Sequence, residues 1–253
     1  MVAVMHGSTG RSGERVFFLA MTVAILAAVL VGFARTFFLR PLFPEIVAEF
    51  AAPEPYFLVH GVFFAVWFAL LAVQAVLVTF ERVDLHRRLG PLGALLAAAM
   101  LVLGVVGVLI AAHRPTGFIG VPVPPLQFMV QPLTELLLFA VFVGLAVHLR
   151  RDPASHKRLM LLGSIALLGA AIVRWPVSLV MAESPVPGFT ATDLLVDLFI
   201  VPIVAWDLLT RGRPHPATLW GGLALILSQP LRWLPSGTEA WLSFAQWATG
   251  LLG

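Results

Sequence analysis

The chain has 253 residues, of which 60% are hydrophobic and 11% are charged, and it carries a formal net charge of +3. Soluble globular domains carry about 25% charged residues, and the mean hydropathy of this chain is +0.97. The composition therefore excludes an ordinary soluble domain and predicts an integral membrane protein. Because the chain has no cysteine, disulfides, thiolate metal sites and thiol catalysis are excluded as well.

Seven apolar runs are long enough to cross a bilayer as helices, which takes about 20 residues. In chain order they are about 16–34, 56–80, 90–112, 127–149, 158–182, 192–210 and 217–233. A shorter amphipathic stretch at about 238–252 predicts a helix that lies in the membrane interface. The sequence thus predicts an all-α, polytopic transmembrane helix bundle of about seven helices, in which residues 1–253 form a single transmembrane domain.

The basic residues predict the orientation of the bundle. With the amino terminus on the cytoplasmic side, eleven of the sixteen Lys and Arg residues fall on the inner side, and the positive-inside rule then predicts an N-in, C-out topology. These residues lie in short loops rather than in a patch with interleaved aromatic residues. We therefore expect the lipid bilayer as a partner and no nucleic acid.

Two pairs of short matches indicate repeated hairpins. FLVH at 57–60 resembles FMVQ at 128–131, and HRRL at 86–89 resembles HKRL at 156–159, with offsets of 71 and 70 residues. A weaker third copy places His215 at the corresponding point before the last run. Parallel repeats of this kind are common in membrane carriers, although similar hairpins also arise without a transport function.

Three charged residues interrupt the predicted spans, namely Glu135, Arg174 and Asp197. A charge in the hydrocarbon costs about 2.5–3.5 kcal/mol on insertion scales, so such residues usually face a partner, a cavity or a ligand. With a rise of about 1.5 Å per residue, all three fall in the outer half of the bundle.

Further polar residues share that depth. Gln131 lies one helical turn before Glu135, and Asp193 lies one turn before Asp197. We therefore predict a ligand-binding pocket in the outer half, formed by His60, Gln131, Glu135, Arg174, Asp193 and Asp197. Two interpretations remain open: either Arg174 pairs with Glu135 or Asp197 only to join helices, or these residues bind a small molecule or a proton.

Prolines stand beside these polar residues, at 132, 176, 202 and 230. Each removes a backbone donor and frees a carbonyl one turn earlier, which a bilayer tolerates only where protein or a cavity satisfies the carbonyl. The prolines therefore favour a polar pocket over a continuous apolar interface between the helices.

Histidines recur at the inner ends of the runs. His86, His156 and His215 could bind zinc, because three imidazoles and a water form a known catalytic set. Haem b would instead use two imidazoles on facing helices as axial ligands. Because these histidines lie next to arginines, contacts with lipid phosphate are a third interpretation. Nearby, Asp207 and Arg211 have the spacing of an i, i+4 ion pair.

The stretch FLVHGVFFAVWFALLAVQAVLVTFERVDLHRRLGPLG, together with HKRLMLL and TRGRPHPATLWGG, is similar to a family of bacterial multi-pass inner-membrane proteins with HG...Q...HRRLG and HKRLM motifs. The resemblance runs over most of the chain. It implies the membrane fold and a location in the bacterial inner membrane, and it implies no activity, cofactor or catalytic residue.

Three classes of function follow from the sequence. The first is a membrane protein that binds or moves a small molecule or a proton through the outer pocket. The second is a haem-b or metal-dependent membrane redox protein or hydrolase that uses the histidines. The third is a structural or accessory membrane subunit. The chain has no nucleophile elbow, phosphate loop or dinucleotide fingerprint, so we expect no catalytic residue of those kinds.

Overall fold

The computed structural model describes residues 2–45, 54–118, 121, 123–175 and 188–252, with side chains from residue 12 onward. Within these residues the regular structure is helical, and no strand is present. The all-α class predicted from the sequence is therefore confirmed for the described part of the chain.

Four helices are long and apolar enough to cross a membrane, and they match the first four predicted runs. These segments are Ser12–Phe38, Pro55–Thr79, Val83–His113 and Pro125–His148. The first segment covers most of α1 (Val2–Phe33) and the short helix η1 (Ala34–Phe38), and the short helix η2 (Arg40–Leu42) follows it. The other three segments are α3 (Pro55–Thr79), α4 (Val83–His113), and α5 (Pro125–Phe128) together with α6 (Val130–His148). Their length and composition agree with an integral membrane protein.

The second half of the chain is built from shorter pieces. They are α7 (Pro153–Ala166), α8 (Gly169–Ile172), α10 (Ala191–Asp197), α11 (Val201–Arg211), α12 (Pro216–Leu231) and α13 (Glu239–Gly250). The predicted spans at 158–182, 192–210 and 217–233 fall on these pieces, and residues 176–182 of the first lie outside the described residues. The count of seven spans and the N-in, C-out topology stay predictions.

Prolines explain two of the interruptions. Pro202 has no N–H for the carbonyl of Leu198, and the helix is broken between α10 and α11. In the same way Pro132 cannot bond the carbonyl of Phe128, and the break between α5 and α6 lies at Met129. Pro230 is accommodated inside α12, and Pro176 lies outside the described residues.

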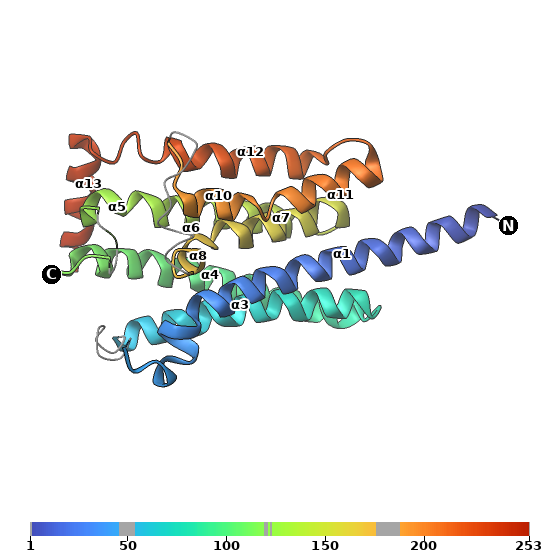
Figure 1. Ribbon diagram of the computed structural model, residues 1–253, viewed down its shortest axis with the longest axis horizontal. Coiled ribbons are helices and arrows are strands. Elements are labelled where there is room, and N and C mark those ends of the chain that lie inside the picture. Colours follow the sequence, from blue (N-terminus) through green and yellow to red (C-terminus); the bar gives the residue numbers. More distant parts are fainter. Residues whose placement is uncertain (1, 46–53, 119–120, 122, 176–187, 253) are drawn as a thin grey trace.

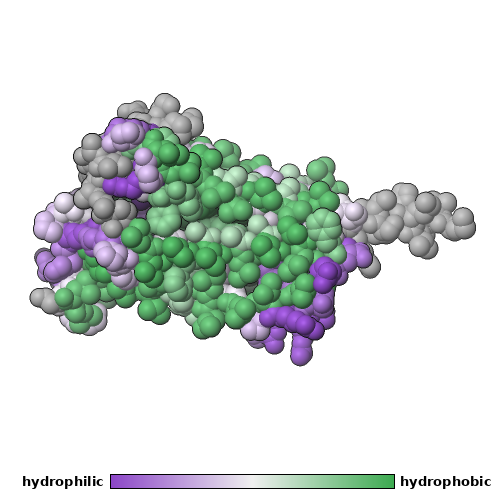
Figure 2. All heavy atoms as spheres, turned by 90° about the horizontal axis from the view of Figure 1, so that it is seen from below, coloured by the Kyte–Doolittle hydropathy of each residue, from purple (hydrophilic) through white to green (hydrophobic). Residues whose placement is uncertain are grey.

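The helices run side by side along the long axis of the molecule (Figure 1). α3 packs against α1 and α4, while α7 packs against α6 and α12. α13 crosses the end of the bundle, where it packs on α4 and α5. Figure 2 shows hydrophobic residues across the middle of the molecule and hydrophilic residues toward both ends, the pattern that a bilayer requires of a protein surface.

A buried ion pair joins three of the shorter helices. Arg158 of α7 pairs with Asp207 of α11, and the two side chains are 1% and 0% exposed. Asp207 Oδ2 also accepts hydrogen bonds from Thr218 Oγ1 at 2.6 Å and from the backbone N–H of His215 at 2.9 Å. Asp207 thus pairs with Arg158 and not with Arg211, because it points into the bundle while Arg211 is exposed.

We expect Asp207→Leu to destabilise the protein by about 3–5 kcal/mol, because it leaves Arg158 buried without a counter-charge. Thermal unfolding in detergent measures the effect. Glu45→Ala is the control, since it removes the exposed Arg35–Glu45 pair and should cost about 1 kcal/mol or less. Equal losses in the two variants would contradict the role given to Asp207.

Candidate functional site

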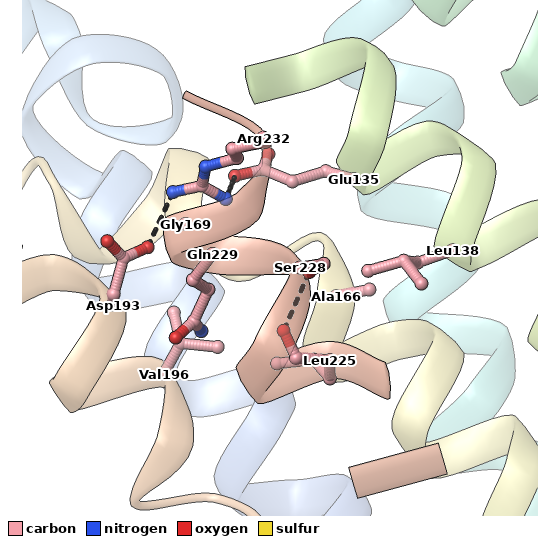
Figure 3. A pocket seen from close by; sticks show the side chains of 10 residues that line it. All are labelled: Glu135, Leu138, Ala166, Gly169, Asp193, Val196, Leu225, Ser228, Gln229 and Arg232. Carbon is pink, nitrogen blue, oxygen red and sulfur yellow. Dashed lines mark hydrogen bonds and ion pairs between the residues drawn. The ribbon is translucent and has the colours of Figure 1, made fainter. Parts of the chain in front are cut away.

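Five polar side chains from α6, α10 and α12 gather near one arginine that follows the end of α12. We call this group the Arg232 cluster, and it consists of Gln131, Glu135, Asp193, Asp197, Gln229 and Arg232. Arg232 Nη2 donates to Asp193 Oδ1 at 2.6 Å, and its Nη1 lies 3.8 Å from Glu135 Oε1 (Figure 3). The side chains of Arg232 and Asp193 are 4% and 5% exposed, so this is a buried ion pair.

The start of α10 holds Asp193 in place. Thr190 and Asp193 form a capping box: Asp193 N–H donates to Thr190 Oγ1 at 3.1 Å, and Asp193 Oδ2 accepts from Thr190 N–H at 2.9 Å. Thr190 Oγ1 also lies 2.7 Å from Asp193 Oδ2. One carboxylate oxygen therefore caps the helix, and the other is left for Arg232.

The two other carboxyl groups have amide partners. Gln131 Nε2 donates to Glu135 Oε1 at 3.2 Å, and Gln229 Nε2 donates to Asp197 Oδ1 at 2.9 Å. Glu135 also lies close to the backbone at Gly169, where an added Cβ atom would be 2.8 Å from Glu135 Oε1. The absence of a side chain at Gly169 is what allows α8 to approach this carboxyl group so closely.

A small cavity lies within the cluster. Its volume is about 20 Å³, and Glu135, Asp193, Ser228, Gln229 and Arg232 contribute to its lining (Figure 3). A buried water needs about 10–15 Å³, so the cavity is large enough for a water molecule.

Two buried polar atoms of the cluster lack a hydrogen-bond partner within the described residues. They are the acceptor Gln229 Oε1 and the donor Arg232 Nε, on side chains whose residues are 3% and 6% exposed. Buried polar atoms are rarely left unpaired, because the desolvation of each costs about 1–3 kcal/mol. A water in the cavity could satisfy groups of both kinds.

Four of the six predicted pocket residues meet in this cluster: Gln131, Glu135, Asp193 and Asp197. His60 lies elsewhere, between α3 and α4, where its Nδ1 is 3.4 Å from the carbonyl oxygen of Leu103 and its ring stacks on Phe64. Whether the cluster binds a ligand stays a prediction.

The expected role of Arg174 is corrected. Its Nη1 donates to the carbonyl of Ala170, and its guanidinium lies 4.6 Å from the ring of Phe33. Within the described residues it forms no ion pair with Glu135 or Asp197: the residue is exposed, and its guanidinium lies over a ring of α1. Arg232 takes the position that the sequence analysis assigned to Arg174.

Sequence reasoning missed Arg232 and Gln229 as members of the site. Both residues belong to the last predicted run, three positions apart and on either side of Pro230. Residues three apart share a helical face, and this spacing at the same end of the bundle as Asp193 was the available signal.

The three histidines predicted to bind zinc do not converge. His86 and His156 face each other with ring centroids 6.2 Å apart, while His215 caps α12 by accepting the N–H of Ala217 at its Nδ1. Burial lowers the pKa of His215, and the positive charge of Arg158 acts in the same direction, so the imidazole is neutral as this cap requires. In the described part of the chain, no group of three or more His, Cys, Asp or Glu residues is placed to hold a metal ion.

Comparison with known proteins identifies no relative: no protein-family model, curated protein or solved structure matches this chain. The resemblance to bacterial inner-membrane proteins therefore stays a prediction, and function must be argued from the site itself.

Arg232→Leu leaves Asp193 buried without its counter-charge, so we expect a loss of about 3–5 kcal/mol of stability. The matched control is Arg174→Leu, which removes an arginine that has no carboxylate partner among the described residues and should cost about 1 kcal/mol or less. Thermal unfolding of the two variants in detergent compares them. A larger loss for Arg174→Leu would reverse the roles assigned to the two arginines.

Proposed function

We propose that this chain is a seven-span membrane protein whose Arg232 cluster binds and moves protons. The observation that carries the proposal is that carboxyl groups outnumber basic groups around a cavity large enough for a water molecule. The carboxyl groups of Glu135 and Asp193 lie beside one guanidinium and line the cavity of about 20 Å³. A third carboxyl group, that of Asp197, is bonded to Gln229, which also lines the cavity.

The charge balance supports protons as the bound species. Asp193 is partnered by Arg232 at 2.6 Å, whereas Glu135 lies 3.8 Å from the same guanidinium and Asp197 is bonded to a neutral amide. An ionised carboxylate without a counter-charge is costly away from water, and the usual response is to keep its proton. A proton is therefore the cation that offsets the charge of a single carboxyl group without further ligands.

The amide partners suit a group that changes its protonation state. A glutamine amide can donate to a carboxylate through its NH2 and accept from a carboxylic acid through its carbonyl oxygen. Gln131 and Gln229 are bonded to the two carboxyl groups that lack a close cation, and Gln229 Oε1 is unpartnered. A proton on Asp197 or on a water in the cavity therefore has an acceptor next to it.

The size of the cavity favours a proton over a small organic molecule, because a solute of several heavy atoms would need a rearrangement of α6, α10 and α12. A structural role is the second candidate. It is favoured by the Asp193–Arg232 pair, which is buried and joins α10 to α12 in the manner of a helix staple.

Proton flux into liposomes separates these two functions. The purified chain is reconstituted into liposomes that contain a pH-sensitive dye, and a potassium diffusion potential drives proton entry. We expect flux above that of protein-free liposomes, and we expect Glu135→Gln and Asp197→Asn each to reduce it to the protein-free level, because neither amide can carry a proton at neutral pH.

Glu239→Gln serves as the control, because Glu239 is an exposed carboxylate at the start of α13, and it should leave the flux unchanged. A wild-type protein whose flux equals that of protein-free liposomes would favour the structural candidate.

A further inference from the structure

Two imidazoles from different hairpins face each other at the start of α4 and the start of α7. The rings of His86 and His156 have centroids 6.2 Å apart and planes at 83°. These are the matching positions of HRRL and HKRL. Neither residue belongs to the Arg232 cluster.

His156 is held in the orientation of a metal ligand. Its Nδ1 lies 2.8 Å from the carbonyl oxygen of Ala146 in α6. Since a carbonyl oxygen can only accept, Nδ1 carries the hydrogen, and in the neutral imidazole Nε2 then has the lone pair. Metal-ligating histidines almost always donate their second ring N–H to a carboxylate, a backbone carbonyl or water, which fixes the ring and the tautomer.

Two unpartnered polar atoms belong to His86 and to its neighbour Gln74. His86 Nδ1 and Gln74 Oε1 are both buried and have no hydrogen-bond partner among the described residues. Gln74 Nε2 donates to the backbone carbonyl of His86 at 3.3 Å, so these two residues are neighbours. Unsatisfied atoms of this kind call for an explanation such as a bound ion or water.

We propose that His86 and His156, with Gln74 as an oxygen donor beside them, bind a divalent copper or zinc ion. Imidazole nitrogen suits both metals. Metal–nitrogen bonds of about 2.0–2.1 Å hold two ligating nitrogens within about 4 Å of each other, and rings with centroids 6.2 Å apart meet that limit when a nitrogen of each faces the other. His215 has no part in this site, since its Nδ1 caps α12.

Two arginines lie next to His86 in the sequence. Arg87 and Arg88 follow His86 in the sequence, and both are exposed, so solvent or lipid headgroups screen their charges. The charge of Arg87 still acts on the imidazole of His86. The coordination positions that the protein leaves open would be filled by water, as at metal sites with fewer than four protein ligands.

Metal binding by the full-length chain tests the proposal. The protein is purified in detergent without a histidine tag, stripped with a chelator, and titrated separately with Cu²⁺ and Zn²⁺ against a competing indicator. We expect one equivalent per chain, and we expect His86→Gln and His156→Gln each to weaken binding at least 10–100-fold, the loss that removing even an outer-shell partner typically causes. His148→Gln is the matched control, because His148 is an exposed histidine at the end of α6, and it should bind like the wild type.

A second measurement needs no variant. The electron paramagnetic resonance spectrum of the copper-loaded wild type should show hyperfine coupling to two imidazole nitrogens. Coupling to fewer than two, equal binding by all the variants, or no binding by the wild type would overturn the proposal. A haem absorption band that is lost in His86→Gln or His156→Gln would assign the pair to haem iron and overturn it as well.

The proposals of a metal site and of a proton site can be tested independently of each other. Glu135→Gln should keep the bound metal, and His156→Gln should keep the flux, because the two groups share no residue.

Discussion

The second half of the bundle depends on one constraint: an arginine inside a helix bundle must meet enough negative charge to offset its desolvation. Arg232 meets Asp193 and approaches Glu135, and this joins α12 to α10 and to α6. Toward the other end of α12, Arg158 and Asp207 join α7 to α11, and Asp207 also accepts a hydrogen bond from Thr218 near the start of α12. The helices of this half are short and interrupted, and these two buried pairs fix them relative to one another.

The two pairs differ in how completely they are satisfied. Asp207 accepts hydrogen bonds from Arg158, from Thr218 and from the backbone of His215. This arrangement suits a purely structural contact between helices. The Arg232 cluster has more acids than cations, an adjacent cavity, and a free donor and acceptor. Those features are unnecessary for holding helices together, and for this reason we assign the proposed proton binding to this end of the bundle.

Much of this site could be predicted from the sequence, since spacing along a helix determines which residues share a face. Gln131 with Glu135, and Asp193 with Asp197, were placed together by their i, i+4 spacing and by their depth, and the structure brings these pairs to one cluster. The first four candidate spans could be predicted equally well, because each is a continuous apolar run of sufficient length.

Which arginine pairs with the acids of the cluster could not be predicted from spacing and depth. The depth of a residue along a helix does not determine the direction in which its side chain points around the helix axis. Arg174 lies over Phe33 because its neighbour Trp175 donates a hydrogen bond to the carbonyl of Ala28 in α1. Asp207 likewise pairs with Arg158, which is 49 positions away in the sequence, and not with Arg211, which is one turn along the same helix. In both cases tertiary packing decided a choice that local spacing left open.

Infrared difference spectroscopy of the protein at two pH values tests the central claim most directly, because a protonated carboxyl group has a carbonyl band that a carboxylate lacks. The account predicts a carboxylic-acid band at neutral pH that is lost in Glu135→Gln or Asp197→Asn and retained in Glu239→Gln. A wild-type protein without such a band at neutral pH would show that all three acids of the Arg232 cluster are ionised, and this would contradict a proton-binding site.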